Sequence, residues 1–167
     1  MSISSTRPQA LPPLRRVLIV GGGGREQALA WALSRNGEIT TVWIAPGNGG
    51  PEGQAIDLAE TDSDALVAFC RQEKVDLVVV GPEAPLAAGV ADALRSAEIA
   101  VFGPDAAGAQ LEASKAWAKQ LMQDAAVPTA GHWSVHSEEE ALAVLHKVER
   151  PLVAKADGLA AGKGVTV

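Results

Sequence analysis

Three short stretches of the 167-residue chain combine glycines with charged side chains, and each suits the binding of an anion. The last of them, KADGLAAGKGVTV, runs from Lys155 to Val167. Glycines let backbone N–H groups approach a ligand closely, and lysines add positive charge, so such a loop is typical of phosphate sites. The residues that we expect to contact the phosphates of a nucleotide here are Lys155, Gly158, Gly162, Lys163 and Gly164.

The spacing of this stretch excludes the usual P-loop. That motif, G-x-x-x-x-G-K-[ST], leads into a helix and carries a hydroxyl after its lysine. Here the step from Gly158 to Gly162 is one residue too short, and Gly164 replaces the hydroxyl residue. The flanking segments PLVAKA and VTV are apolar, which predicts two strands joined by a glycine-rich flap. Lys155 would then lie in an apolar strand, where an unpaired ammonium is costly and needs an anionic partner.

Lys115, in EASKAWAK, is a further candidate for contact with the phosphates or the base. The plain alternative is that Lys115, Lys155 and Lys163 are ordinary surface lysines.

The second stretch, VGGGGRE, follows an apolar run and precedes a helical pattern. A glycine turn between a strand and a helix aims backbone N–H groups and a positive helix end at an anion. The dinucleotide motif G-x-G-x-x-G fails here, because Glu26 stands at the third glycine position and the next strand lacks a terminal acid. We expect Gly23, Gly24, Arg25 and Glu26 to lie at a phosphate; the alternative is that the glycines only form a tight turn.

The third stretch, VGPEAPL, follows an apolar strand, at the edge where open α/β sheets bind ligands. We predict a loop held in shape by Pro82 and Pro85, which orients Glu83. The turn-rich PGNGG follows another strand at the same edge and brings Asn48 there. Gly81, Pro82, Glu83 and Asn48 are therefore expected to share a pocket with the glycine turn.

These stretches are held by strands that alternate with helices, which predicts right-handed βαβ units and a parallel sheet. We predict an α/β fold: a parallel-sheet βαβ amino-terminal domain at 16–113, after a flexible tail at 1–15, followed by an incomplete second domain at 114–167. The predicted strands are 16–20, 40–45, 75–80, 99–103, 132–135, 151–156 and 165–167. The predicted helices are 26–35, 62–73, 87–98, 114–127 and one that begins at a capping box formed by Ser137 and Glu140.

Composition limits the classes of function. A hydrophobic content of 47% with 20% charged residues is that of a globular protein. The net charge of −6 argues against a nucleic-acid partner, and no apolar run is long enough to span a membrane. The single cysteine, Cys70, cannot form an internal disulfide, which favours a cytoplasmic location.

Taken together, the motifs resemble the amino-terminal part of the phosphoribosylamine–glycine ligase family, in the ATP-grasp superfamily. The resemblance runs from Arg16 to Val167, with its segments in the family's order. It is carried by VLIVGGGGREQALAWAL, APGNGG, VDLVVVGPEAPLAAGV, VFGP, LEASKAWAKQLM, VPTA and LVAKADGLAAGKGV.

The resemblance implies a ligase of de novo purine synthesis. ATP would phosphorylate glycine, and the amine of 5-phosphoribosylamine would attack the glycyl phosphate to give glycinamide ribonucleotide. By this analogy the turn, Asn48 and Gly81, Pro82 and Glu83 bind the ribosyl phosphate substrate. Lys115, Lys155, Gly158, Gly162, Lys163 and Gly164 serve ATP, and Mg²⁺ ligands lie in a part of the family that this chain lacks. No catalytic residue is assigned.

Two positions depart from the family's usual GNGGREHA: Gly22 replaces the Asn and Gln27 replaces the His. Any role that the family gives to those two positions is therefore in doubt here.

The resemblance further implies a truncated chain, the incomplete front part of an ATP-grasp domain, which is inactive alone and favoured to be monomeric. Two alternatives stay open: another ATP-grasp carboxylate–amine ligase, and a nucleotide-binding module without catalysis.

Overall fold

The computed structural model describes residues 13–148, 150–160 and 163–167. The described residues fall into two compact units. The first comprises the chain up to Gly81 together with Ala93–Gly103, and the second comprises Pro82–Asp92 and Pro104–Val167. The flexible tail expected at 1–15 lies almost wholly outside the described residues, and the domain boundary after residue 113 stays a prediction.

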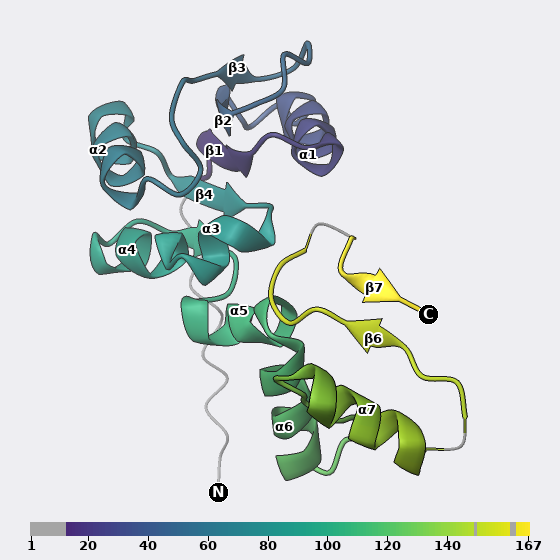
Figure 1. The fold of residues 1–167 in the computed structure, drawn as a ribbon. Helices are drawn as coiled ribbons and strands as arrows, with labels where there is room; N and C mark the ends of the chain where they lie inside the picture. The colour runs from purple at the N-terminus through teal and green to yellow at the C-terminus, as the bar shows by residue number, and fades with distance from the viewer. Residues whose placement is uncertain (1–12, 149, 161–162) are drawn as a thin grey trace, which may run out of the picture. The chain divides into compact units, whose positions relative to one another are not determined.

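The first unit is built on a parallel sheet, which confirms the predicted α/β class (Figure 1). Its five strands lie in the order β3-β2-β1-β4-β5, and every neighbouring pair is parallel. The strands are β1 (Arg16–Gly21), β2 (Thr41–Pro46), β3 (Gln54–Ala55), β4 (Leu77–Val80) and β5 (Val101–Phe102). β3 was not predicted, and β5 is shorter than the predicted strand 99–103.

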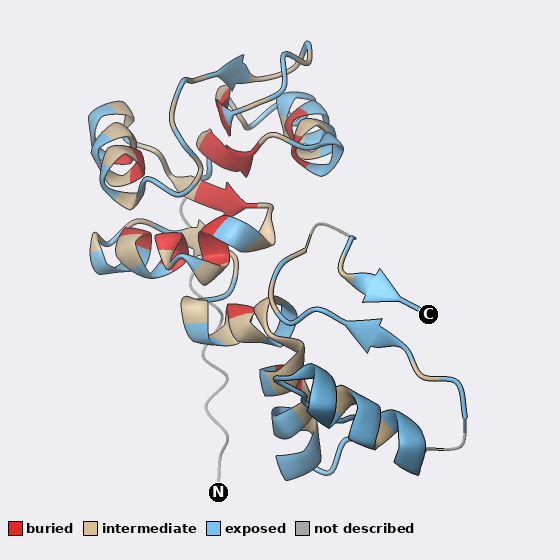
Figure 2. Cartoon of the chain, in the orientation of Figure 1, coloured by how far each residue is buried: buried red, intermediate tan, exposed pale blue. Residues whose placement is uncertain are grey.

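The core of the first unit surrounds the central strand β1, whose residues Val17–Val20 are fully buried. Helix α1 (Gly24–Ser34) covers the face on which Val17 and Ile19 pack with Ala30. Helix α2 (Ser63–Glu73) covers the other face, where Trp43 and Phe69 meet edge to face with their ring centroids 5.4 Å apart. Because both faces are covered, β1 is apolar at every position from Val17 to Val20 rather than alternating, and the strand is coloured as buried in Figure 2.

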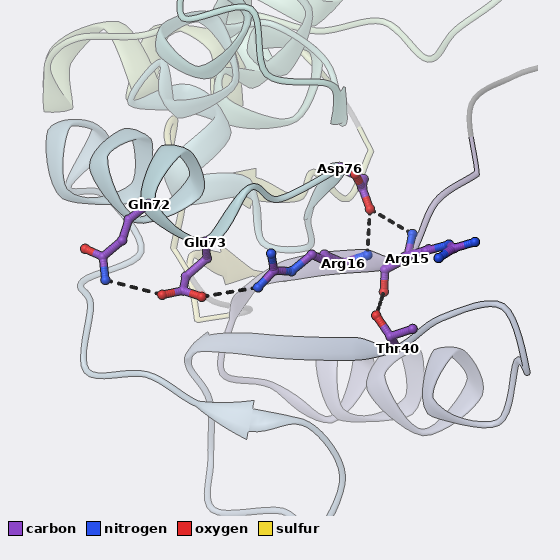
Figure 3. A network of polar contacts seen from close by, with 6 residues as sticks. All are labelled: Arg15, Arg16, Thr40, Gln72, Glu73 and Asp76. Atoms are coloured by element: carbon purple, nitrogen blue, oxygen red, sulfur yellow. Dashed lines mark hydrogen bonds and ion pairs between the residues drawn. The ribbon is translucent and has the colours of Figure 1, made fainter.

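A network of polar contacts fixes the start of β1 (Figure 3). The Asp76 carboxylate accepts hydrogen bonds from the backbone N–H groups of Arg15 and Arg16, both at 2.8 Å. The guanidinium of Arg16 lies 3.4 Å from the Glu73 carboxylate at the end of α2. Thr40 donates its hydroxyl to the Arg15 carbonyl at 3.1 Å. These contacts tie the first residues of β1 to the segments that lead into β2 and β4, and so support the parallel register.

Cys70 lies on the buried side of α2, where it is 2% exposed. Burial raises the pKa of its thiol to about 11.

The second unit is mainly helical and ends in a two-stranded antiparallel sheet. Helix α4 (Val90–Ser96) contributes residues to both units. The other elements are α3 (Glu83–Ala87), α5 (Ala106–Ala113), α6 (Lys115–Asp124), α7 (Glu138–Lys147), β6 (Ala154–Lys155) and β7 (Val165–Thr166). The pairing of β6 with β7 confirms the predicted hairpin around the glycine-rich loop.

Several predicted elements of the second unit were wrong. The stretch GPEAPL is not a loop, because α3 begins at Glu83, directly after Pro82. Pro85 fits this helix since it lies in the first turn, where its missing N–H has no partner to lose. Residues 132–135 form no strand, and α5 was not predicted. The predicted helix 87–98 is interrupted near Gly89, whose φ of +85° lies in the left-handed region.

The predicted capping box of α7 forms only in part. Ser137 accepts the N–H of Glu140 as expected, but the Glu140 carboxylate accepts the N–H of His136.

None of the helices within residues 13–148, 150–160 and 163–167 has the length and apolarity needed to cross a bilayer.

Candidate functional site

The glycine turn after β1 is packed against the loop that follows β2. A Cβ atom at Gly22 would lie 2.7 Å from the carbonyl oxygen of Gly47, which is closer than side chains approach. The two loops can therefore touch here only because residue 22 has no side chain. Gly22 thus serves a close backbone contact in this structure.

Glu26 is the buried charge of this turn, at 3% exposure. One carboxylate oxygen accepts the N–H of Gly23 at 2.7 Å, and the other accepts Nε of Arg25 at 2.7 Å. The side chain also fills the space beside Gly81, because a Cβ atom there would overlap the carboxylate. Burial alone would raise the pKa of Glu26, but the hydrogen bonds from Arg25 and from Gly23 outweigh it and lower the pKa.

These contacts give Glu26 a supporting role inside the turn, and its contact with a substrate stays a prediction. Gly23, Gly24 and Arg25 are exposed at the start of α1. No atom lies within 4 Å of a Cβ built at Gly24, so the turn is open on that side.

The loop after β2 is fastened to the turn by two amide side chains. Asn48 donates to the carbonyl of Gly23 at 3.3 Å and accepts the N–H of Gly50 at 3.0 Å. Gln27 donates to the carbonyl of Glu52 at 3.0 Å. The structure thus brings Asn48 to the turn, as predicted. Gln27 and Glu52 also hold the loop to the turn, which the sequence did not indicate.

Gly81 directly follows β4 and belongs to the first unit, whereas Pro82 and Glu83 belong to the second unit. Glu83 is half-buried in the first turn of α3, where the helix dipole stabilises a carboxylate. The pocket that these residues were expected to share with the turn stays a prediction.

The second candidate site is the hairpin of the second unit and the start of α6. Lys115 is the first residue of that helix and is half-buried. Its ammonium donates to the carbonyl of Gly158 at 3.1 Å, which brings two predicted ATP-binding residues together. Gly158 has a φ of +93°, a conformation that favours glycine.

The other predicted contacts of ATP lie along the same hairpin. Lys155 and Lys163 are exposed, and Gly164 is half-buried. The expectation that Lys155 lies buried in an apolar strand was wrong, because all of β6 and β7 is exposed. Gly162 lies outside the described residues.

Asp157 is a residue of this site that the sequence did not single out. Its carboxylate accepts the backbone N–H groups of Lys115 at 2.6 Å and of Ala116 at 3.3 Å. The N–H of Ala116, more than any other group, holds the pKa of Asp157 below its usual value. No local signal could have found this contact, because it joins residues more than forty positions apart.

Two surface hollows of the second unit do not coincide with these residues. One runs along α7 and includes Leu142 and His146, and the other lies at the end of α6 and includes Met122 and Pro128. Neither is lined by a predicted substrate or ATP residue.

In a comparison with known protein families, two family models match consecutive parts of this chain. The model of the phosphoribosylglycinamide synthetase N domain matches residues 15–112, and that of the ATP-grasp (A) domain of the same synthetase matches residues 113–167. The phosphoribosylamine–glycine ligase of Salmonella typhimurium is 48% identical over 156 residues, which cover 91% of this chain and 36% of that protein. The chain therefore spans about a third of the length of such curated relatives.

Two solved structures are similar to this fold. The phosphoribosylamine–glycine ligase of Thermotoga maritima is 31% identical with a TM-score of 0.70, over 90% of this chain and 35% of that one. The N5-carboxyaminoimidazole ribonucleotide synthetase of Thermus thermophilus is 24% identical with a TM-score of 0.63, over 90% of this chain and 39% of that one. The second likeness concerns the fold alone.

Proposed function

Because the chain belongs to the phosphoribosylglycinamide synthetase family, we propose that the full-length protein carrying it joins glycine to 5-phosphoribosylamine. A carboxylate oxygen of glycine attacks the γ-phosphorus of ATP, and the bond to ADP breaks. The amine nitrogen of 5-phosphoribosylamine then attacks the carbonyl carbon of glycyl phosphate, phosphate leaves, and the nitrogen loses a proton. The product is glycinamide ribonucleotide, an intermediate of purine synthesis.

The observation that carries this proposal is the hydrogen bond from the Lys115 ammonium to Gly158 in the glycine-rich hairpin. A neutral carbonyl is a weak partner for a half-buried ammonium, and a phosphate oxygen would be a stronger one. The exposed side chains of Lys155 and Lys163 lie on the same hairpin. We assign Lys115, Lys155, Lys163 and the hairpin backbone to the phosphates of ATP, whose negative charge they offset during transfer.

The glycine turn is the candidate site for the ribosyl phosphate. Gly23 and Gly24 are exposed at the amino-terminal end of α1, where the helix dipole favours an anion. The Glu26 carboxylate already accepts a hydrogen bond from the N–H of Gly23. The phosphate would therefore meet the open side of the turn at Gly24, with Glu26 holding the turn in shape from behind.

Magnesium would neutralise part of the phosphate charge, as it does in phosphoryl transfer generally. Across the described parts of the chain, no three His, Cys, Asp or Glu side chains lie together as metal ligands would. We therefore assign Mg²⁺ no ligand in this chain and derive no step through it.

The test compares two lysines of one helix in the full-length protein. Lys119 is matched to Lys115, since its ammonium also donates to backbone, at 2.9 Å to the carbonyl of Ala130. We expect Lys115→Ala to raise the KM for ATP by about tenfold or more, the effect of losing a hydrogen bond to a charged group. Lys119→Ala should leave that KM near its wild-type value.

Release of ADP that requires both glycine and 5-phosphoribosylamine tests the reaction itself. Dependence on a different carboxylate would favour another ATP-grasp ligase, and ATP binding without turnover would favour a module without catalysis. The 167-residue chain serves as the baseline. We expect no turnover from it, because it spans 36% of the length of its curated relatives.

The exposed Lys155 gives a second comparison, with Lys147 at the end of α7 as the control. Lys155→Ala should weaken the use of ATP more than Lys147→Ala does. Equal and small effects of the two substitutions would contradict the assignment of the hairpin to ATP.

A further inference from the structure

We propose that Asp157 is a positioning residue, which fastens the glycine-rich hairpin to the start of α6 and thereby sets the Lys115 ammonium beside the hairpin. The consequence for ATP rests on the proposed function above. The fastening itself rests only on contacts within the second unit.

The carboxylate of Asp157 completes the hydrogen bonding of the first turn of α6. It accepts the N–H groups of Lys115 at 2.6 Å and Ala116 at 3.3 Å. The hydroxyl of Ser114 lies 3.1 Å from its other oxygen and also accepts the N–H of Trp117 at 3.1 Å. The first three N–H groups of the helix, which have no partner inside it, are therefore all satisfied.

Ordinary capping does not require Asp157. Helices α2, α5 and α7 are each capped by the side chain of the residue that directly precedes them, and α6 has such a cap in Ser114. Asp157 is an additional partner that comes from the hairpin, more than forty residues further along the chain. A contact of this kind joins two segments, which is the reason for assigning it a positioning role.

Lys115 is held at two points by consecutive residues of the hairpin. Its backbone N–H binds Asp157, and its side-chain ammonium binds the carbonyl of Gly158. The pair of contacts fixes where the ammonium lies relative to the loop. The Asp157 carboxylate also occupies the amino-terminal end of α6. An incoming phosphate would therefore meet the Lys115 ammonium and the hairpin, not the helix end.

The carboxylate is charged under the conditions in which the contact would operate. The N–H of Ala116 is the main cause that lowers the pKa of Asp157, with the N–H of Lys115 and the hydroxyl of Ser114 in support. The cationic side chains nearest in sequence to the contact are Lys115 on α6 and Lys155 on β6.

The experiment compares Asp157→Ala with Asp105→Ala in the 167-residue chain by amide hydrogen exchange. Asp105 is a matched control, because it caps α5 through the N–H of Gly108 but contacts no distant segment by that bond. We expect Asp157→Ala to speed exchange about tenfold at Lys115 and Ala116, the size of a lost cap. Exchange should also rise at Ala156, whose N–H donates to Gly164 across the hairpin at 2.7 Å.

Asp105→Ala should speed exchange at Gly108 and leave Ala156 unchanged. If Asp157→Ala affects only Lys115 and Ala116, the carboxylate is a simple cap and the proposal is overturned. Asp157→Asn keeps one acceptor oxygen without the charge, so intermediate exchange at Ala156 would support the fastening even if the alanine variant folded poorly.

The second arm measures kinetics in the full-length protein. Asp157→Ala should raise the KM for ATP by about tenfold with a smaller change in kcat, and Asp157→Asn should recover part of the loss. An unchanged KM overturns the positioning role. Absence of ligase turnover in the unsubstituted full-length protein would instead overturn the proposed function, and the exchange arm would still decide whether Asp157 fastens the hairpin.

Discussion

Glu26 shows how a single buried carboxylate can organise a glycine turn from inside. Its two oxygens serve the N–H of Gly23 and the guanidinium of Arg25, and its side chain occupies the space beside Gly81. An unpaired carboxylate would be costly at this depth, so these partners are a condition of its burial. The turn and the end of β4 are thereby linked through one side chain.

The lowered pKa of Glu26 predicts how stability depends on pH. A carboxyl group whose pKa is lowered by folding stabilises the folded state above the usual glutamate value of 4.5, and this contribution is lost as the pH falls through the lowered value. Glu26→Gln should therefore cost about 1.5–3 kcal/mol at pH 7, with the cost shrinking at acidic pH. Urea unfolding at a series of pH values measures the difference, and a difference independent of pH would contradict the assignment.

Gly81 predicts a steric effect at the same place. A methyl group there would overlap the Glu26 carboxylate, so Gly81→Ala should lower the free energy of unfolding by about 1–3 kcal/mol. Gly24→Ala is the matched control, because no atom lies within 4 Å of its Cβ position. Denaturant unfolding of the two variants should separate them, and equal stability would mean that Glu26 moves aside freely.

At the scale of elements, the strands of the two units differ sharply in burial. The residues of β1 from Val17 to Val20 are fully buried, whereas every residue of β6 and β7 is exposed. Two-residue strands with one neighbour gain little from packing. The hairpin therefore depends on contacts such as that of Asp157 more than on its own pairing.

This contrast predicts unequal protection of backbone amides. Exchange should be slowest at Val17–Val20 and Leu77–Val80, and much faster, with only modest protection, at Ala154–Lys155 and Val165–Thr166. Native-state hydrogen exchange resolved by residue is the measurement. Comparable protection in the two regions would show that the hairpin is as stable as the parallel sheet.

The elements also show what the sequence could predict. β1 was found because a strand covered on both faces is apolar throughout, and the hairpin was found from its glycines and flanking apolar residues. The prediction of a loop at GPEAPL was wrong because it rested on the two prolines, and proline suits the first turn of a helix as well as a loop. The exposure of Lys155 could not be predicted, because burial of a strand depends on neighbours that its own residues do not specify.

In the candidate sites, too, some contacts could be predicted from the sequence and others could not. Residue types indicated the glycine turn, Asn48 and Lys115, and the structure places Asn48 against the turn and Lys115 against Gly158. Asp157 escaped notice because its partners lie more than forty positions away, and local spacing carries no trace of such a contact. The burial of Glu26 was missed because a glutamate beside exposed glycines suggests a ligand as readily as a support.

At the scale of the whole molecule, the two units bury very different amounts of apolar side chain. The first unit contains most of the largest fully buried side chains, including Leu18, Ile19 and Leu66. The second unit leaves large apolar side chains such as Trp133, Leu142 and Leu145 exposed, and no residue of α7 is buried (Figure 2). Since apolar burial is the main source of stability, the second unit should be the weaker one.

We therefore predict unfolding in two steps. Fluorescence of Trp43, which is buried in the first unit, should change at a higher urea concentration than that of Trp133 in the second. Because the sequence has four tryptophans, one variant keeps only Trp43 and another keeps only Trp133, with Phe at the other three positions, so that each signal follows one residue. Coincident transitions for both reporters would show that the two units unfold as one.

The burial of Cys70 has a practical consequence for spectroscopy. It is the single cysteine of the sequence, and its thiol is both inaccessible and protonated at neutral pH. A maleimide dye should therefore react only with cysteines introduced at exposed positions, without prior removal of Cys70. Dye pairs placed on the exposed surfaces of α6 and of β7 could then report the distance between helix and hairpin in an otherwise unlabelled native background.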